Sequence, residues 1–431
     1  MGFISNLTKE EIIKAYAAHV SSGKVDFYEL VGLDFVLGHR AGPWMTDTPN
    51  KDHEGPPLRL LNCHCNGGVF NLGHRHPEVV NVLAKALHEL DIGNHHLISE
   101  QRALLAKNLV ALTPSAITRV VFGVGGGEAV DFAVKLARAH TKKHKIIHAE
   151  GGYHGHTGFA LAAGAERFKA PFEPLVPGYV AVPFGDSNAI KAAIDGETAA
   201  VLLETIPATL GMPMPPDDYY AEIREVCDNH GVLLILDEIQ TGLGRTGKLW
   251  AFEHYNMVPD IFCIAKGLSG GLYPIAATLY REELDPFCRE NPFIHVSTYG
   301  GAELGCPVAL KVLEISSSPD FLERVNQIAI ELKAGLETLR EKYSDILMEI
   351  RQKGLFIGLK MADEGYGPVM SLASVRNGIF AVFADNDRSV LQFLPPLILK
   401  DEEIVYLLEN LDRAFNWAKE NPEYLEFARH L

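Results

Sequence analysis

The sequence contains little cysteine and tryptophan and no long apolar run. Its 431 residues include six cysteines and three tryptophans. A chain of this length with so few cysteines is not built on a disulfide scaffold. No uninterrupted apolar stretch approaches the ~20 residues of a membrane-spanning helix, and residues 1–10 lack the basic and apolar regions of a signal peptide. We therefore expect a cytoplasmic protein without a membrane partner.

Basic residues are also scarce. Lys and Arg number 39 against 55 Asp and Glu, which gives a formal net charge of −16. A nucleic-acid-binding protein needs a basic face to meet the phosphate backbone, so the composition argues against this class. The hydrophobic fraction of 47% and the charged fraction of 22% are those of an ordinary globular protein. At roughly 150 residues per domain, the length predicts two or three folding units, or one large domain with a smaller one.

The chain lacks the paired cysteines of a zinc site. Cys63-His64-Cys65 brings two thiols and an imidazole together, but a single residue separates the thiols. Zinc sites usually place about two to four residues between paired thiolates, and no second pair follows here. We expect buried structural thiols and no metal.

Apolar runs alternate with helical patterns between about residues 60 and 300. The runs are nearly continuous, as in strands buried on both faces of a mainly parallel sheet. Strand and helix in alternation predict an α/β core. The expected strands are residues 119–124, 145–149, 199–203, 232–236, 261–265 and 273–279, and the expected helices are residues 127–140 and 217–230.

The pattern changes after about residue 305, where long amphipathic helices and short strands predict a smaller α+β domain. Near the N-terminus, Thr8 and Glu11 form a capping box that opens a helix, and the Gly-, Pro- and Asp-rich residues 38–57 predict an irregular connection. The expected C-terminal helices are residues 306–316, 320–343 and 401–420, with strands in residues 347–360 and 390–393. We predict a segment of residues 1–60 that joins the small domain, a large domain of residues 61–300 and the small domain of residues 301–431.

Glycine is frequent, and three of the 39 glycines are consecutive. Gly125, Gly126 and Gly127 follow an expected strand and lead into an expected helix. Glycines let the backbone approach a ligand closely, and a helix N-terminus offers free N–H groups, so this turn is a candidate phosphate site. The alternative is a tight turn without a ligand. The dinucleotide fingerprint is excluded because Glu128 stands where its last small residue belongs.

Two polar residues follow other expected strands, at the edge where open α/β sheets bind ligands. Asp237 can pair with a cationic ring nitrogen or a metal, or can cap a helix. Lys266 carries an amine that can form a Schiff base when burial lowers its pKa. A phosphate site, an acid for a pyridinium nitrogen and a Schiff-base lysine are together the parts of a pyridoxal phosphate site.

Two other motifs compete with this interpretation. Residues 242–249 nearly match a nucleotide-binding P-loop, but Leu249 replaces the hydroxyl residue that would hold Mg²⁺. Residues 267–271 match the nucleophile elbow of α/β-hydrolases, which should enter a helix, whereas a strand is expected here. A hydrolase triad would consist of Ser269, Asp385 or Asp387, and His430.

Several longer motifs stand in a characteristic order from about residue 42 to 413. On these motifs the sequence resembles the class III aminotransferases, which are fold-type-I pyridoxal phosphate enzymes. The resemblance implies a large domain with a mainly parallel seven-stranded sheet, a smaller α+β domain, and a homodimer with the active site at its interface. The matching stretches are G-H-R-H-P at residues 73–77, G-Y-H-G at 152–155, L-I-L-D-E-I-Q-T-G-L-G-R-T-G at 234–247, P-D at 259–260, A-K-G at 265–267, S-T-Y-G-G at 297–301 and L-P-P-L at 394–397.

The resemblance also implies a role for each cofactor-site residue. Lys266 would hold pyridoxal phosphate as an internal aldimine and shuttle the proton, and Asp237 would keep the pyridinium nitrogen protonated. Tyr153 and Ile239 would cover the two ring faces, and Gln240 would lie near the ring hydroxyl. The three glycines would cradle the phosphate with Thr298 of the neighbouring subunit. His154 and Glu204 complete the expected cofactor site.

Departures from the family pattern bear on the substrate. The family usually has a small hydroxyl residue at the position of Gly125 or Gly127, and often Asn-Pro where this chain has Ala302-Glu303. It often has an Arg at the position of Gln392, and a neutral amide cannot replace its bidentate, charge-assisted pair with a carboxylate. Thr209 replaces a Glu that pairs with this Arg in several members.

These departures argue against 2-oxoglutarate as the co-substrate. Arg40, Arg102 and Arg167 are alternative candidates for a carboxylate site. Trp44, Thr209 and Gln392 are the candidate substrate residues.

Three functions remain open on the sequence alone. The first is transamination of an amine or ω-amino compound with a keto-acid acceptor. The second is a pyridoxal phosphate-dependent racemase, epimerase, aminomutase, decarboxylase or lyase, because the same cofactor residues serve all of these reactions. The third is a cofactor-binding protein without catalysis, or a hydrolase.

Overall fold

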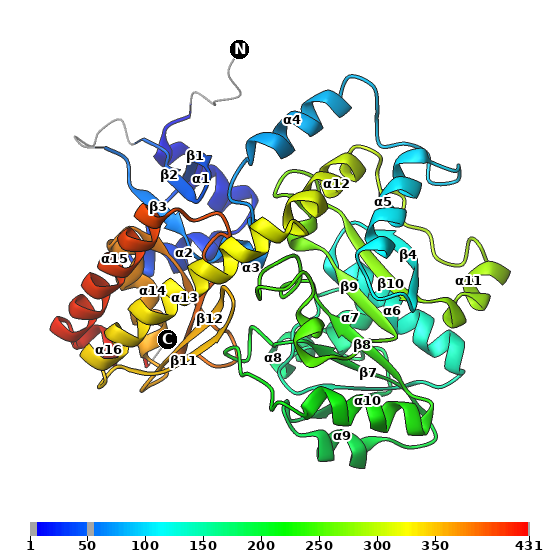
Figure 1. Cartoon of the computed structure of the whole chain (residues 1–431). Helices are drawn as coiled ribbons and strands as arrows, with labels where there is room; N and C mark the ends of the chain where they lie inside the picture. The colour runs from blue at the N-terminus through cyan, green and yellow to red at the C-terminus, as the bar shows by residue number, and fades with distance from the viewer. Residues whose placement is uncertain (1–6, 50–55, 430–431) are drawn as a thin grey trace.

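The largest sheet has seven strands and lies in the right-hand half of the molecule as drawn in Figure 1. The computed structural model describes residues 7–49 and 56–429. The strand order is β4-β10-β9-β8-β7-β5-β6, and only β10 runs antiparallel to its neighbours. This arrangement confirms the predicted α/β fold with a mainly parallel sheet. The strands are β4 (Ile117–Gly123), β5 (Lys145–Ala149), β6 (Tyr179–Val182), β7 (Thr198–Glu204), β8 (Leu233–Asp237), β9 (Ile261–Ile264) and β10 (Ala276–Arg281).

Both faces of this sheet are covered, as the continuous apolar runs predicted. Successive side chains of a strand point to opposite faces, so Leu202 and Ile235 pack in one core while Leu203 and Leu236 pack in the other. Helix α6 (Gly126–Thr141) covers the first face. The second face is covered by α5 (Glu100–Ala111), α10 (Tyr219–His230) and α12 (Gly305–Ser316).

A second sheet lies in the C-terminal part, with the order β11-β12-β15-β14 and all pairs antiparallel. It packs with four helices around a separate core. Its predicted helices are confirmed to within one residue at most ends. The elements are β11 (Leu347–Lys353), β12 (Phe356–Met361), β14 (Val382–Phe383), β15 (Val390–Phe393), α13 (Pro319–Lys342), α14 (Tyr366–Arg376), α15 (Asp401–Glu420) and α16 (Glu423–Ala428).

The N-terminal strands join a C-terminal strand in a third sheet, β1-β2-β3-β13. In its one parallel pair, Leu61 of β3 is aligned with Ile379 of β13. The prediction of an irregular connection over residues 38–57 is wrong for its first part, because a turn at Gly42 (φ 55) pairs β1 with β2. Residues 50–55 of that stretch lie outside the described residues. The strands are β1 (Leu37–Ala41), β2 (Trp44–Asp47), β3 (Arg59–Asn62) and β13 (Ile379–Phe380).

The N-terminal helix α1 (Lys9–His19) begins at the predicted capping box, in which Thr8 and Glu11 exchange side-chain-to-backbone hydrogen bonds. Helix α12 shares its core with the large sheet, whereas α13 packs in the C-terminal core. The domain boundaries at residues 60 and 300 stay a prediction. The remaining elements are α2 (Ser22–Leu30), α3 (Cys65–Gly68), α4 (Pro77–Ala86), α7 (Gly158–Ala162), α8 (Glu166–Lys169), α9 (Ser187–Ala193), α11 (Pro286–Glu290), η1 (Ala170–Phe172), η2 (Ala251–Tyr255), η3 (Lys266–Ser269) and η4 (Glu282–Leu284).

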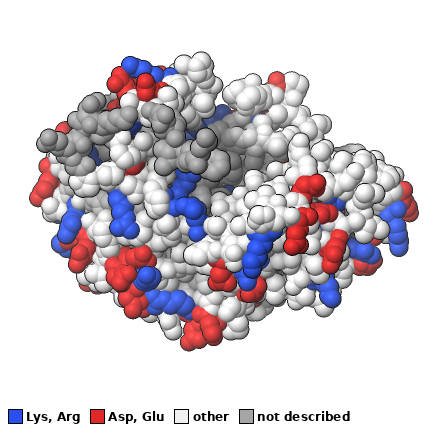
Figure 2. All heavy atoms as spheres, turned by 90° about the horizontal axis from the view of Figure 1, so that it is seen from above, with Lys and Arg blue, Asp and Glu red and all other residues white. Residues whose placement is uncertain are grey.

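Charges of both signs lie on the face of the molecule that Figure 2 shows. In Figure 2, acidic and basic side chains alternate along the lower margin of the molecule. Among the described residues, none of the helices combines the length and hydropathy needed to cross a bilayer.

Candidate active site

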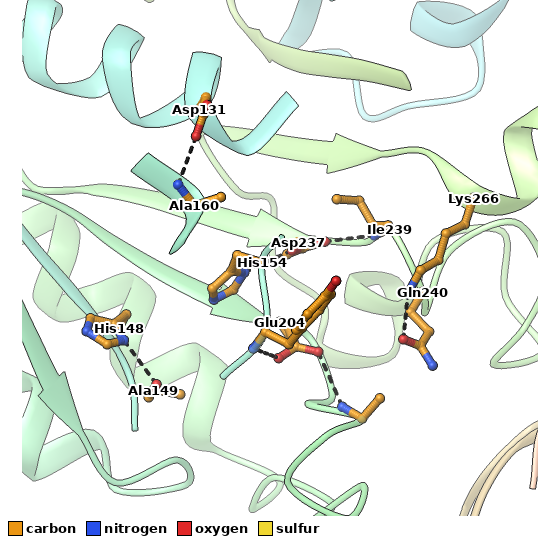
Figure 3. Close-up of polar contacts among 12 residues, drawn as sticks. Asp131, His148, Ala149, His154, Ala160, Glu204, Asp237, Ile239, Gln240 and Lys266 are labelled. Carbon is orange, nitrogen blue, oxygen red and sulfur yellow. Dashed lines mark hydrogen bonds and ion pairs between the residues drawn. The ribbon is translucent and has the colours of Figure 1, made fainter. Parts of the chain in front are cut away.

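The parallel strands bring three polar residues to one edge of the large sheet (Figure 3). Glu204, the last residue of β7, is aligned with Asp237, the last residue of β8. Lys266 follows β9 by two residues and begins η3. All three line a cavity of about 390 Å³, together with Tyr153, Ile239, Gln240 and the three glycines at the start of α6. The cavity lies where an open α/β sheet is expected to bind its ligand.

Lys266 holds its amine inside this cavity. Its Nζ donates to Oε1 of Gln240 at 2.8 Å. Burial lowers the pKa of Lys266, although the charges of Asp237 and Glu204 oppose the change. Gly67 faces the amine so closely that a Cβ on Gly67 would lie 3.0 Å from Nζ. A buried amine with a lowered pKa is the activated form of a lysine nucleophile.

Asp237 is fixed by two hydrogen bonds. Its Oδ2 is 2.9 Å from Nδ1 of His154, and its Oδ1 accepts the backbone N–H of Ile239 at 3.0 Å. Burial alone would lower the pKa of His154, but the hydrogen bond and the charge of Asp237 raise it above its usual value. His154 Nε2 is buried and has no hydrogen-bond partner among the described residues. The pair presents a negative carboxylate, backed by an imidazole, to a cationic ligand group.

Glu204 positions the segment that carries Tyr153. Its Oε1 accepts the Tyr153 N–H at 2.9 Å, and its Oε2 accepts the Ala208 N–H at 3.3 Å. Burial raises the pKa of Glu204 to about 7, against the effect of His154 and the two N–H groups. Tyr153 keeps 37% of its surface exposed, so its ring is available to a ligand at the mouth of the cavity.

The three glycines form the N-terminus of α6, and two of them have no room for a side chain. A Cβ on Gly126 would lie 2.8 Å from Cδ1 of Ile239, and a Cβ on Gly127 would lie 2.8 Å from Oγ1 of Thr157. A Cβ on Gly125 would meet nothing within 4 Å. The N–H groups of the first helical turn have no partner within the helix, so this close backbone is a cradle for an anion.

Two residues expected in or near the site lie outside the cavity in this chain. Thr298 is exposed in the loop between α11 and α12. Trp44 donates its Nε1–H to Oε1 of Glu403 at 3.1 Å and packs edge-on against Tyr406. Neither residue is among those that line the cavity.

Thr209 and Gln392, which depart from the family pattern, also lie outside the cavity lining. Thr209 bonds a backbone carbonyl, and Gln392 is buried in a strand. Thr209 donates its hydroxyl to the carbonyl of Gly151 at 3.3 Å, and Asn386 donates to the same carbonyl at 2.7 Å. Gln392 lies in β15 and is buried. Within the described parts of the chain, neither Thr209 nor Gln392 lines the cavity.

No arginine is among the described residues that line the cavity, and Lys266 is their single lysine. Arg102 donates to the carbonyls of Gly301, Asn94 and Leu97. Arg167 forms an ion pair with Asp385 at 3.2 Å. Arg40 is exposed in β1. The three candidate carboxylate-binding arginines are therefore not among the described residues that line the cavity.

The competing motifs have structural roles. Ser269 donates its hydroxyl to the carbonyl of Lys266 at 2.7 Å, so it fixes the turn that presents the lysine. Asp385, one of the two acids considered for the hydrolase triad, forms an ion pair with Arg167. His430, the histidine considered for that triad, lies outside the described residues. In the P-loop-like stretch, Arg245 is fully buried and donates to Asn71 Oδ1 at 2.7 Å and to the carbonyl of Leu355 at 3.0 Å.

Sequence reasoning missed part of the cavity wall. The four residues 272–275 line the cavity directly after the Gly-rich loop of residues 267–271, whose Ser269 and Gly271 also line it. The sequence contains a feature that predicts their place at the cavity, because the Gly-rich loop directly follows the lysine. Val69 also lines the cavity, and it stands between the stretches at residues 63–65 and 73–77 without belonging to either.

Comparison with known proteins identifies close similarity over the whole chain. The family model described as "Aminotransferase class-III" matches residues 49–415. An uncharacterized aminotransferase of Archaeoglobus fulgidus is 59% identical over 431 residues, covering 100% of both chains. The ornithine aminotransferase of Toxoplasma gondii superposes with a TM-score of 0.87 at 24% identity, over 96% of both chains. An amine transaminase from an uncultivated Pseudomonas species, solved with pyridoxal phosphate bound, has a TM-score of 0.80 at 26% identity over 89% of this chain and 95% of that one.

Proposed function

The chain belongs to the class III aminotransferases, and on this premise we propose that it moves the amino group of an amine or ω-amino compound to a keto acid, with pyridoxal phosphate bound at Lys266. The observation that carries the proposal is the convergence of three groups on one cavity. These are the buried Lys266 amine, the Asp237–His154 pair and the glycine cradle.

The residues present fit this cofactor. The cradle of Gly125, Gly126 and Gly127 offers backbone N–H groups to a phosphate, and Asp237 offers a carboxylate to the ring nitrogen. Tyr153 and Ile239 stand on the cavity wall to cover the ring. When bound, the cofactor supplies an electron sink for the electrons released as a bond to the substrate carbon breaks.

Each residue of the chain has a defined task in this proposal. Lys266 would hold the cofactor through Nζ, and once a substrate amine has displaced this nitrogen from the cofactor, the freed amine would take a proton from the substrate carbon and return it. The lowered pKa keeps a larger fraction of this amine unprotonated, as a base requires. Gln240 orients the amine by accepting its hydrogen bond. Asp237 stabilises positive charge on the ring nitrogen, and His154 holds the carboxylate in place.

Trapping the cofactor tests the central residue. Borohydride reduction followed by mass spectrometry should locate the cofactor mass on the Lys266 peptide of the wild type. Lys266→Ala should lose both the trapped mass and the activity. Lys248→Ala, a change at an exposed lysine, is the matched control and should keep both. Trapping that persists in Lys266→Ala would remove the basis of the proposal.

A second function is favoured by the cavity wall. Since no arginine lines the described wall, a substrate α-carboxylate lacks the usual bidentate partner. A racemase, epimerase, aminomutase, decarboxylase or lyase needs no keto-acid acceptor, so the wall would not have to bind the carboxylate of a second substrate.

The requirement for an acceptor separates the two functions. With an amine donor alone, transamination should stop after one equivalent of product and leave the cofactor as pyridoxamine phosphate. Adding a keto acid should restore turnover. Continuous product formation without any keto acid would favour the second function.

We also propose that a second copy of the chain completes the site. Large apolar side chains are exposed on residues 87–98 and on the loop of residues 292–299, and Arg102 donates to the carbonyls of Asn94 and Leu97 in the first segment and to that of Gly301, two residues after the second. A cluster of this kind on a globular protein marks an interaction site. Thr298 lies in the same loop, from which it would reach the cradle of the partner. The exposed side chains are Leu87, Ile92, Leu97, Ile98, Phe293, Ile294, Val296 and Tyr299.

A further inference from the structure

The glycine cradle carries no hydroxyl of its own, yet the structure brings one to it. Thr157 reaches the start of α6 from a different segment of the chain. A Cβ on Gly127 would lie 2.8 Å from Thr157 Oγ1 and 3.3 Å from its Cγ2. The threonine hydroxyl therefore occupies the space that a side chain at position 127 would take.

The position of Thr157 relative to α6 is fixed by two contacts. Gly155 packs directly on the cradle, since a Cβ on Gly155 would lie 2.7 Å from the Cα of Gly127. Asp131 in α6 accepts the N–H of Ala160 in α7 at 2.8 Å (Figure 3). Thr157 lies between these two contacts along the chain. Its hydroxyl is therefore held beside the first turn of α6 by the surrounding backbone.

The hydroxyl of Thr157 is not engaged elsewhere. Thr157 is the N-cap residue of α7, but its side chain makes no capping hydrogen bond. Over residues 7–49 and 56–429, the hydroxyl has no hydrogen-bond partner, and the residue is exposed. An N-cap threonine usually accepts a backbone N–H of its helix. This one is free to donate to a ligand held at Gly127, which lines the cavity, whereas Thr157 itself is not among the described residues that line it.

We propose that Thr157 is a ligand of the cofactor phosphate and supplies the hydroxyl that Gly125 and Gly127 lack. The proposal rests on the proposed function, because it requires a phosphorylated cofactor in the cavity. The Oγ1–H donates to a phosphate oxygen, and a hydrogen bond to a charged acceptor is stronger than a neutral one. Its loss should weaken cofactor binding by roughly ten-fold or more.

Cofactor binding to the apoprotein tests this assignment. The dissociation constants of pyridoxal phosphate and of pyridoxal, which has no phosphate, are measured for the wild type, Thr157→Val and Thr157→Ser. Thr157→Val keeps the shape and removes the hydroxyl, and it should bind pyridoxal phosphate about ten-fold more weakly with pyridoxal unaffected. Thr157→Ser should bind both ligands as the wild type does. The melting temperatures of the apoproteins verify that each variant folds.

Moving the hydroxyl across the cradle gives a second test. Gly127→Ser alone must displace the Thr157 side chain and should weaken binding of pyridoxal phosphate. Gly127→Ser combined with Thr157→Ala has room for the new side chain, and it should bind more tightly than Thr157→Ala alone.

The assignment is overturned if Thr157→Val binds pyridoxal phosphate like the wild type, or if it loses affinity for both ligands equally. These results leave the proposed function intact. Failure of the wild type itself to bind pyridoxal phosphate at Lys266 would instead refute the proposed function.

Discussion

Lys266 presents its amine from a backbone conformation that few residues other than glycine adopt. Its φ is 35°, in the left-handed region, which costs an ordinary residue of the order of 1 kcal/mol. The turn is held by Ser269, whose hydroxyl bonds the Lys266 carbonyl, and by Leu268, whose N–H bonds the Ala265 carbonyl at 2.8 Å. The surrounding hydrogen bonds thus keep the side chain aimed at Gln240 and the cavity.

Glu238 shows how a buried carboxylate next to the site organises a loop. It accepts hydrogen bonds from the Thr205 and Thr241 hydroxyls and from the N–H groups of Ala251 and Phe252. Burial raises the pKa of Glu238 to about 7, while these four donors favour the ionised form. The carboxylate therefore joins the end of β8 to the chain some thirteen residues later.

Replacing this carboxylate by an amide should destabilise the protein. Glu238→Gln places two N–H donors among four other donors, and unsatisfied buried groups cost roughly 1–3 kcal/mol. We expect a lower melting temperature measured by circular dichroism. Glu225→Gln makes the same change at an exposed position and should leave the melting temperature unchanged. An unchanged melting temperature in Glu238→Gln would contradict this account of the loop.

At the scale of elements, buried strands were the most predictable part of the fold. The strands β7, β8 and β9 begin and end within one residue of the predicted positions. A strand that is covered on both faces is apolar along its whole length, so the polar residues at its two ends mark its bounds clearly. Asp237 and Lys266 were found at these strand ends, and the structure places both on one cavity. Their catalytic roles stay predictions.

Other elements depend on partners that a local pattern does not contain. The hairpin of β1 and β2 has a composition typical of a loop and was missed. The short edge strand β6 was not predicted, since its four residues pair only with β5. The side chains of Trp44 and Thr209 bond Glu403 and the Gly151 carbonyl, which are remote or backbone partners that no sequence spacing reveals.

At the scale of the whole molecule, the exposed apolar segments predict the assembly state. Ile98 is fully exposed in the single chain, a state that is costly for an isoleucine unless a partner covers it. Ile98→Asp places a charge in the proposed interface. We expect it to shift the mass in light scattering from dimer to monomer and to weaken cofactor binding, because Thr298 of the partner would be lost from the cradle.

Ile330 provides the matched control for this change. It is 71% exposed on α13, away from the two segments. Ile330→Asp should remain a dimer with unchanged cofactor affinity. A dimeric Ile98→Asp, or a monomeric wild type, would contradict the proposed interface.

The pairing of β3 with β13 can form only late in the synthesis of the chain. Leu61 is aligned with Ile379, roughly 300 residues later in the chain. At about 5–20 residues per second, a ribosome needs roughly 15–60 s to make the intervening chain. During that time the edge of β3 that will receive β13 has no strand to pair with. An open strand edge is a template for wrong pairing, so the newly made N-terminal sheet is exposed to wrong pairing until β13 has been synthesised.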